Sequence, residues 1–122
     1  MNYEDRITKS YLEDALAAKC EIVFGTYVGD GALSQQIDLG FRPKAVYVCR
    51  CDGSTRLRSD TGEIAHYGGL AVNGGAAYTE YNYSTIIAIN DTGFSVFYST
   101  TTSAAVVRAN ENGHKYFYIV FK

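Results

Sequence analysis

The stretch LGFRPKAVYVCRC, residues 39–51, decides how the chain is interpreted, because it holds the only proline and two of the three cysteines. From residue 44 on it is mostly apolar, and Cys49 and Cys51 alternate with Arg50. This texture is typical of a buried strand bounded by turns. Side chains two residues apart on a strand point to the same face, so the two thiols are expected to lie side by side. Pro43 restricts the residue before it and would set the entry to the strand.

A metal site is the alternative interpretation of the two thiols. Structural zinc sites combine two ligand pairs, with the members of each pair two to four residues apart. The remaining candidates, Cys20, His66 and His114, are far apart in the sequence and supply no second pair. We therefore expect a sheet strand that contains thiols, with no metal and no cofactor.

Length and net charge indicate a single domain and argue against a nucleic-acid-binding protein. The chain has 122 residues, enough for one domain with its own core, and a formal net charge of −2. Nucleic-acid binding needs clustered basic residues, and the nearest candidates, Arg50, Arg56 and Arg58, are diluted by Asp52 and Asp60. No signal peptide and no apolar run of membrane-spanning length is found, so we expect synthesis in a cytosol, no membrane insertion and reduced thiols.

Residues 1–20 are expected to form a short N-terminal helix for oligomerisation or attachment. Apolar residues follow helical spacing between residues 7 and 19, and Lys9, Glu13 and Asp14 lie on another face. The apolar positions are Ile7, Tyr11, Leu12, Ala15, Leu16 and Ala18. A helix of about three turns is marginal alone. It must therefore pack on its own domain or on copies of itself.

Residues 21–122 are expected to form a β domain, an antiparallel β-sandwich or open barrel of about seven to nine short strands. Glycine and turn pairs such as Asp52-Gly53 and Asn112-Gly113 recur between apolar runs. Residues 62–84 are the least regular part and are expected to be a long loop with short strand pieces. Residues 115–122 are so apolar that they predict a central strand.

No pattern of catalytic residues emerges. There is no G-x-S-x-G motif, the carboxylates are scattered over predicted turns, and the glycines of residues 25–31 precede no helix or lysine. His66 borders the irregular stretch and is a better candidate base than His114, which follows a turn glycine. We expect no enzyme and no catalytic residues.

Tyrosines gather in the irregular stretch among Gly, Asn, Thr and Ser. Rigid amphipathic rings beside adaptable polar groups are typical of binding loops. The predicted ligand-binding residues are Tyr67, Asn73, Tyr78, Tyr81 and Tyr83. The alternative is that these rings pack on the flank of the domain or across a subunit interface.

Several pieces resemble one group of viral proteins. FGTYVGDGALSQQIDLGFRPKAVYV (24–48), GGLAV (68–72), INDTGFSV (89–96) and YIVFK (118–122) are similar to segments of tail-fibre and receptor-binding proteins of tailed bacteriophages and prophages. The resemblance covers about residues 21–122. Its pieces are turn-and-strand motifs, so it specifies architecture better than chemistry.

The resemblance implies a non-enzymatic virion protein, made in the bacterial host cytoplasm and located in the tail. It would be a structural or receptor-binding module of a tail fibre or baseplate that attaches to host cell-surface polysaccharide. The implied partners are other tail proteins, the host glycan and copies of the chain, with a trimer favoured. The alternative function is a free monomeric carbohydrate-binding domain of bacterial or prophage origin. A glycan hydrolase is a third, and it would need paired carboxylates.

Overall fold

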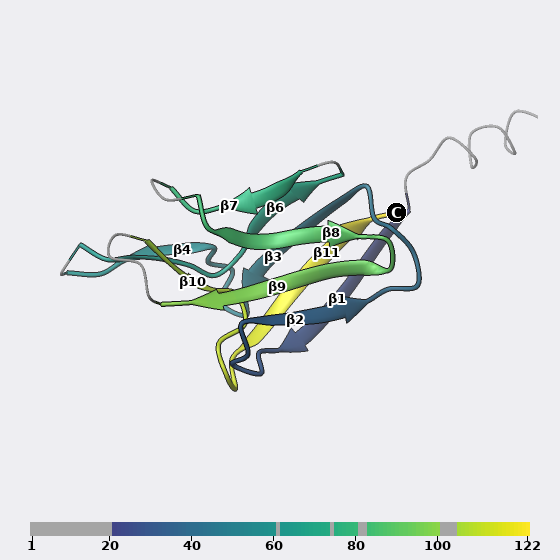
Figure 1. Cartoon of the computed structure of the whole chain (residues 1–122). Coiled ribbons are helices and arrows are strands. Elements are labelled where there is room, and N and C mark those ends of the chain that lie inside the picture. Colours follow the sequence, from purple (N-terminus) through teal and green to yellow (C-terminus); the bar gives the residue numbers. More distant parts are fainter. Residues whose placement is uncertain (1–20, 61, 74, 81–82, 101–104) are drawn as a thin grey trace, which may run out of the picture.

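The computed structural model describes residues 21–60, 62–73, 75–80, 83–100 and 105–122, and in them the chain is mainly β. Figure 1 shows the strands as two groups that lie across each other. The strands are β1 (Ile22–Val28), β2 (Ser34–Asp38), β3 (Ala45–Arg50), β4 (Arg56–Arg58), β5 (Ile64–His66), β6 (Gly69–Val72), β7 (Ala76–Tyr78), β8 (Thr85–Asn90), β9 (Gly93–Ser99), β10 (Ala105–Arg108) and β11 (Lys115–Phe121).

The first sheet has the order β1-β11-β3-β6, and every pair in it is antiparallel. The closing strand β11 lies between β1 and β3, so the prediction of a central closing strand is confirmed. The stretch that holds the two thiols is also a strand, as predicted. It ends at Arg50, however, and Cys51 lies in the turn beyond it.

The second sheet has the order β4-β5-β10-β9-β8-β7, and β2 also pairs with β9. The pair β5–β10 is parallel, with Ile64 opposite Ala105, so the expectation of an exclusively antiparallel arrangement is wrong. The described residues contain eleven strands rather than seven to nine. The surplus comes from 62–80, where the expected loop contains three short strands of three or four residues.

The two sheets share one core. Its fully buried members come from both sheets, with Val46, Val48 and Val120 from the first and Ile87 and Val96 from the second. Alternation along each strand sends these side chains inward because successive residues point to opposite faces. The core is thus built from apolar side chains of both sheets. Cys49 is a free thiol and is not part of a disulfide.

Two buried tyrosines join the sheets at one end of this core. Tyr27 on β1 and Tyr116 on β11 face each other in register, and their rings stack with centroids 4.9 Å apart. The hydroxyl of Tyr27 donates to the carbonyl of Ala109, and that of Tyr116 donates to the carbonyl of Arg108, at the end of β10. Burial raises the pKa of Tyr116 to about 12, so this hydroxyl remains a donor at neutral pH.

A buried amide secures the turn between β1 and β2. The Asn110 side chain is fully buried, and its Nδ2 donates to Asp30 Oδ1 at 2.6 Å and to the Ala32 carbonyl at 3.0 Å. The amide of Ala32 also donates to Asp30 Oδ1 at 2.9 Å, and this hydrogen bond is the main reason that the pKa of Asp30 is lowered. The GDG turn of the sequence is thus tied to the loop between β10 and β11.

The division at residue 20 is a sequence prediction only, because the expected helix at 1–20 lies outside the described residues. The described part of the β region contains no helix.

Gly68 offers a direct test of this packing. A Cβ at Gly68 would overlap the carbonyl oxygen of Val48, whereas a Cβ at Gly75 would be 3.6 Å from the Val72 carbonyl, an ordinary contact. We expect Gly68→Ala to lower the free energy of unfolding by about 1–3 kcal/mol, because overpacking displaces backbone. Gly75→Ala is the control and should have little effect. Urea denaturation measures both, and equal stability of the two variants would contradict the close approach of β6 to β3.

Candidate functional site

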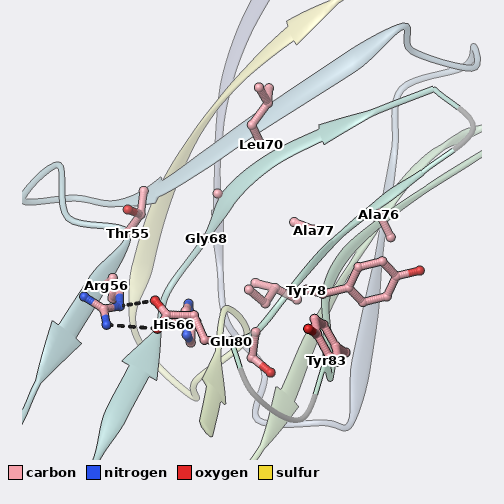
Figure 2. Close-up of a pocket in the computed structure, with 13 residues that line it drawn as sticks. Thr55, Arg56, His66, Gly68, Leu70, Ala76, Ala77, Tyr78, Glu80 and Tyr83 are labelled. Carbon is pink, nitrogen blue, oxygen red and sulfur yellow. Dashed lines mark hydrogen bonds and ion pairs between the residues drawn. The ribbon is translucent and has the colours of Figure 1, made fainter. Parts of the chain in front are cut away.

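A cavity of about 580 Å³ opens where β4 and β5 approach β6 and β7. Figure 2 shows charged groups on one side of it and two tyrosine rings on the other. Its lining residues are Thr55, Arg56, His66, Gly68, Gly69, Leu70, Ala76, Ala77, Tyr78, Thr79, Glu80, Tyr83 and Ile86. Both sheets contribute to it, so the cavity depends on how the sheets are held together.

An ion pair forms the polar side of the cavity. Arg56 Nε lies 2.8 Å from Glu80 Oε1, and Arg56 Nη2 donates to Glu80 Oε2 at 3.3 Å. Both side chains are about half exposed. A pair at this exposure adds little to stability. The N–H groups of the Arg56 guanidinium and the carboxylate oxygens of Glu80 nevertheless remain accessible to a ligand.

His66 lines the same cavity as this ion pair, and one of its ring nitrogens has no hydrogen-bond partner among the described residues. The residue is buried, and its Nε2 has no hydrogen-bond partner within the part of the chain that the structure describes. Burial lowers the pKa of His66, the Glu80 carboxylate opposes that effect, and Arg56 adds to it. The imidazole is therefore neutral at pH 7. A buried nitrogen without a partner costs free energy, and this one lies beneath the cavity surface, out of direct reach of a ligand.

Two tyrosines form the aromatic side. Tyr78 is 54% exposed at the end of β7, and Tyr83 is 74% exposed. The two ends of the loop that carries Tyr83 are held by Thr79, whose amide donates to the Ser84 carbonyl at 2.8 Å and whose Oγ1 accepts from the Ser84 amide at 3.0 Å. Tyr83 has a φ of 52°, a left-handed conformation that non-glycine residues rarely adopt. Such strain is common at binding sites.

The structure divides the predicted ligand-binding residues. It brings Tyr78 and Tyr83 together at the cavity, and Tyr81 lies outside the described residues. Tyr67 does not line this cavity. It is 6% exposed and packs in the core, and the Arg50 guanidinium, 4.3 Å from its ring centroid, lines a separate hollow with it.

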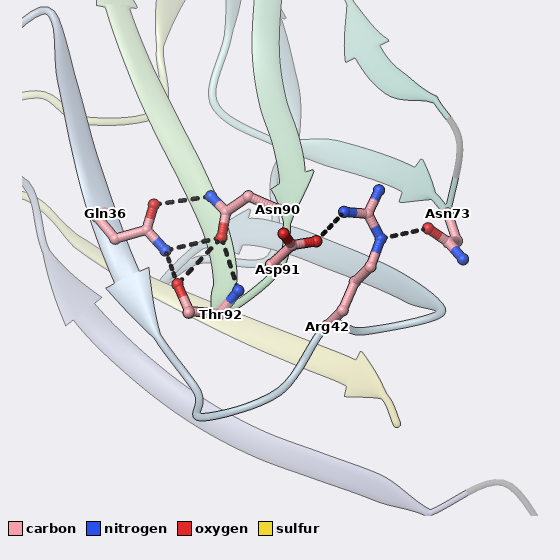
Figure 3. Close-up of polar contacts among 6 residues, drawn as sticks. All are labelled: Gln36, Arg42, Asn73, Asn90, Asp91 and Thr92. Atoms are coloured by element: carbon pink, nitrogen blue, oxygen red, sulfur yellow. Dashed lines mark hydrogen bonds and ion pairs between the residues drawn. The ribbon is translucent and has the colours of Figure 1, made fainter.

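Asn73 is also separate from the cavity. Its Oδ1 accepts a hydrogen bond of 2.8 Å from Arg42 Nε, and Arg42 Nη1 forms an ion pair of 2.9 Å with Asp91. Figure 3 shows this chain of contacts beside a second one, in which Asn90 Nδ2 donates to Gln36 Oε1 at 2.7 Å. The contacts join the corner before β3 to the β8–β9 turn. Asn73 therefore supports the corner rather than the candidate site.

Three polar members of the site were missing from the sequence prediction. The sequence shows Arg56 only as part of a diluted basic cluster, and it suggests His66 only as a candidate base. Glu80 stands directly before Tyr81 in the tyrosine-rich stretch, but nothing in the sequence paired it with Arg56, 24 residues earlier. Their proximity arises from the sheet order and has no local sequence signal.

The thiols and carboxylates of the described residues are not grouped into a metal site. Desolvation raises the pKa of Cys49, which keeps its thiol protonated. Across residues 21–122, in the parts that are described, no group of three or more His, Cys, Asp or Glu side chains is placed to hold a metal ion. None of the described segments is a helix that is long and apolar enough to span a membrane.

Comparisons with protein-family models, with curated proteins and with solved structures each find no match to this chain. The resemblance to phage tail proteins therefore rests on the quoted sequence pieces alone.

His66 gives the site a pH signature. Since its pKa is lower in the folded state, the stabilising contribution of the neutral form is complete above the unfolded value of about 6.5 and is lost as pH falls below it. We expect the free energy of unfolding to decrease between pH 7 and pH 5, and His66→Gln to reduce this decrease.

His114→Gln is the control, because His114 lies outside the cavity, in a turn. The lowered pKa values of Asp30 and Asp52 act at more acidic pH. Urea denaturation at both pH values measures the slope. An unchanged slope in His66→Gln would contradict the buried neutral imidazole.

Proposed function

We propose that the chain is a non-enzymatic tail module of a bacteriophage or prophage that binds host cell-surface polysaccharide in the cavity between β4–β5 and β6–β7. The observation that carries the proposal is the grouping of two exposed tyrosines and an accessible ion pair around one cavity. Two sheets on a shared core support the β-sandwich that the pattern of strands and turns predicts.

The chemistry of the cavity suits a sugar. Pyranose rings present C–H groups on their faces and hydroxyls at their edges, so they combine aromatic stacking with hydrogen bonds. Tyr78 and Tyr83 supply aromatic surface, and Arg56 and Glu80 supply donors and acceptors for hydroxyls. His66 contributes its neutral imidazole to the wall of the cavity, with its Nε2 atom buried beneath the surface. The tyrosine hydroxyls can form hydrogen bonds with the hydroxyls of a sugar or with the water around it.

The carboxylates favour binding over hydrolysis. Glycoside hydrolysis uses two carboxyl groups on either side of the scissile bond. Glu80 is the one carboxylate among the described lining residues, and it is engaged by Arg56. A binding module therefore fits these residues better than a hydrolase.

Affinity would come from several copies acting together. A shallow site binds one sugar unit weakly, and linking copies raises apparent affinity by roughly 10²–10⁴-fold when the geometry allows simultaneous contact. A trimer, or attachment of several copies to other tail proteins, would supply this linkage. The free monomeric carbohydrate-binding domain would share the cavity and lack the linkage, so solution mass by light scattering separates the two.

The aromatic side of the cavity provides the test of binding. We expect Tyr78→Ala and Tyr83→Gly each to weaken binding to purified host cell-wall polysaccharide by about tenfold, because each removes an aromatic contact. Tyr83→Gly should leave the free energy of unfolding within about 1 kcal/mol of the original, since glycine relieves the left-handed strain at an exposed position.

Two control variants make the result specific. Val28→Ala removes an apolar side chain about as exposed as Tyr78, 55% against 54%, at the end of β1 and away from the cavity, and Asn73→Ala removes the predicted residue that lies elsewhere. Both should bind as the original does. Co-sedimentation with the polysaccharide measures all four variants. Full binding by the double variant Tyr78→Ala/Tyr83→Gly would refute this site.

A further inference from the structure

The outer face of the first sheet is unusually apolar. Along β1, β11, β3 and β6 the residues that point away from the core include large apolar side chains, of which Phe24 is 73% and Leu70 is 56% exposed. Exposed apolar residues are ordinary when scattered, whereas a continuous patch indicates a covered surface.

The strand register shows that the patch is continuous. One row across the sheet runs Phe24, Ile119, Tyr47 and Leu70, and the neighbouring row runs Ile22, Phe121, Ala45 and Val72. Directly opposite residues in antiparallel strands are in contact range. A hollow of about 440 Å³ lies in this face, lined by Phe24, Gly25, Thr26, Tyr47, Cys49, Phe117, Tyr118 and Ile119. The face thus offers both apolar area and a depression that a side chain could fill.

We propose that residues 1–20, which lie outside the described residues, form an amphipathic helix whose apolar side covers this face. Those residues carry the apolar series Ile7, Tyr11, Leu12, Ala15 and Leu16 at helical spacing. A helix of this length is marginal in water and needs an apolar surface. Among the described residues, the outer face of the first sheet offers such an apolar surface, and it is exposed to solvent.

The connection and the dimensions agree with this pairing. Residues 1–20 lead directly into β1, an edge strand of this sheet, and the amide of Lys122 donates to the Glu21 carbonyl at 2.9 Å, which fixes the point of entry. Glu21 directly precedes Ile22, the first residue of the second apolar row. A helix of about 13 residues is about 20 Å long, and four strands span about 14 Å from first to last. The helix is therefore long enough to cross the whole sheet.

Cys49 provides a probe inside the covered face, because it lines the hollow. In a full-length background with Cys20→Ser and Cys51→Ser, it is the one remaining thiol. We expect the double variant Leu12→Asp/Leu16→Asp to increase the alkylation rate of Cys49 at least about tenfold, because the face becomes open to solvent. Circular dichroism confirms that the β fold persists.

The matched control introduces the same two charges elsewhere on the helix. Ser10 and Ala17 are seven residues apart and lie on the side away from the apolar series, at about 100° of rotation per residue. Ser10→Asp/Ala17→Asp should leave the alkylation rate of Cys49 unchanged. Equal rates in the original chain and in both double variants would overturn the proposal.

A change on the sheet gives a second, independent readout. Phe24→Asp should lower the urea midpoint of the full chain, whereas Leu33→Asp, at a position of similar exposure in the described structure, should not. Equal midpoints for the two variants would also overturn the proposal.

Solution mass tells which copy supplies the helix. A monomer, or a trimer that Leu12→Asp/Leu16→Asp converts to a monomer with a reactive thiol, supports the helix as the occupant, in its own copy or in a neighbouring one. An oligomer that persists in that variant with Cys49 still protected means that a second copy of the sheet covers the face, which overturns the proposal.

Discussion

The stacked pair of Tyr27 and Tyr116 is the constraint on which the arrangement of the two sheets depends. The rings come from paired strands of one sheet, and their hydroxyls donate to carbonyls at the end of β10 in the other. Each hydroxyl is buried, so losing one partner would leave a carbonyl unsatisfied at a cost of about 1–3 kcal/mol. The same loop holds Asn110, which secures the turn between β1 and β2. One end of the core is thereby fixed.

The parts of the fold that can be predicted are those whose signal lies within a few neighbouring residues. Strands such as β1, β3, β9 and β11 follow from apolar alternation and from flanking turn residues, signals that act over a few positions. The parallel pairing of β5 with β10 depends on residues about 40 positions apart and has no local pattern. The same sheet order places β10 between β5 and β9, where Ala105, Val106 and Val107 are fully buried.

The candidate site was predicted in part for the same reason. Exposed tyrosines among glycine and polar residues were visible in the sequence, and two of them, Tyr78 and Tyr83, line the cavity. Composition could not separate them from Tyr67, which points into the core beneath Arg50. It also could not show that β4 brings Arg56 to Glu80. Side-chain direction and strand order decide both outcomes, and neither is encoded locally.

The proposed function requires that the cavity between β4–β5 and β6–β7 binds a host polysaccharide. The most direct measurement is an amide NMR titration of the full chain with soluble fragments of that polysaccharide. Shifts are expected in residues 68–69 and 76–80, at the cavity, with the amides of Tyr27, Ala109 and Tyr116 unchanged. Shifts confined to the outer face of the first sheet, or none at all, would contradict it.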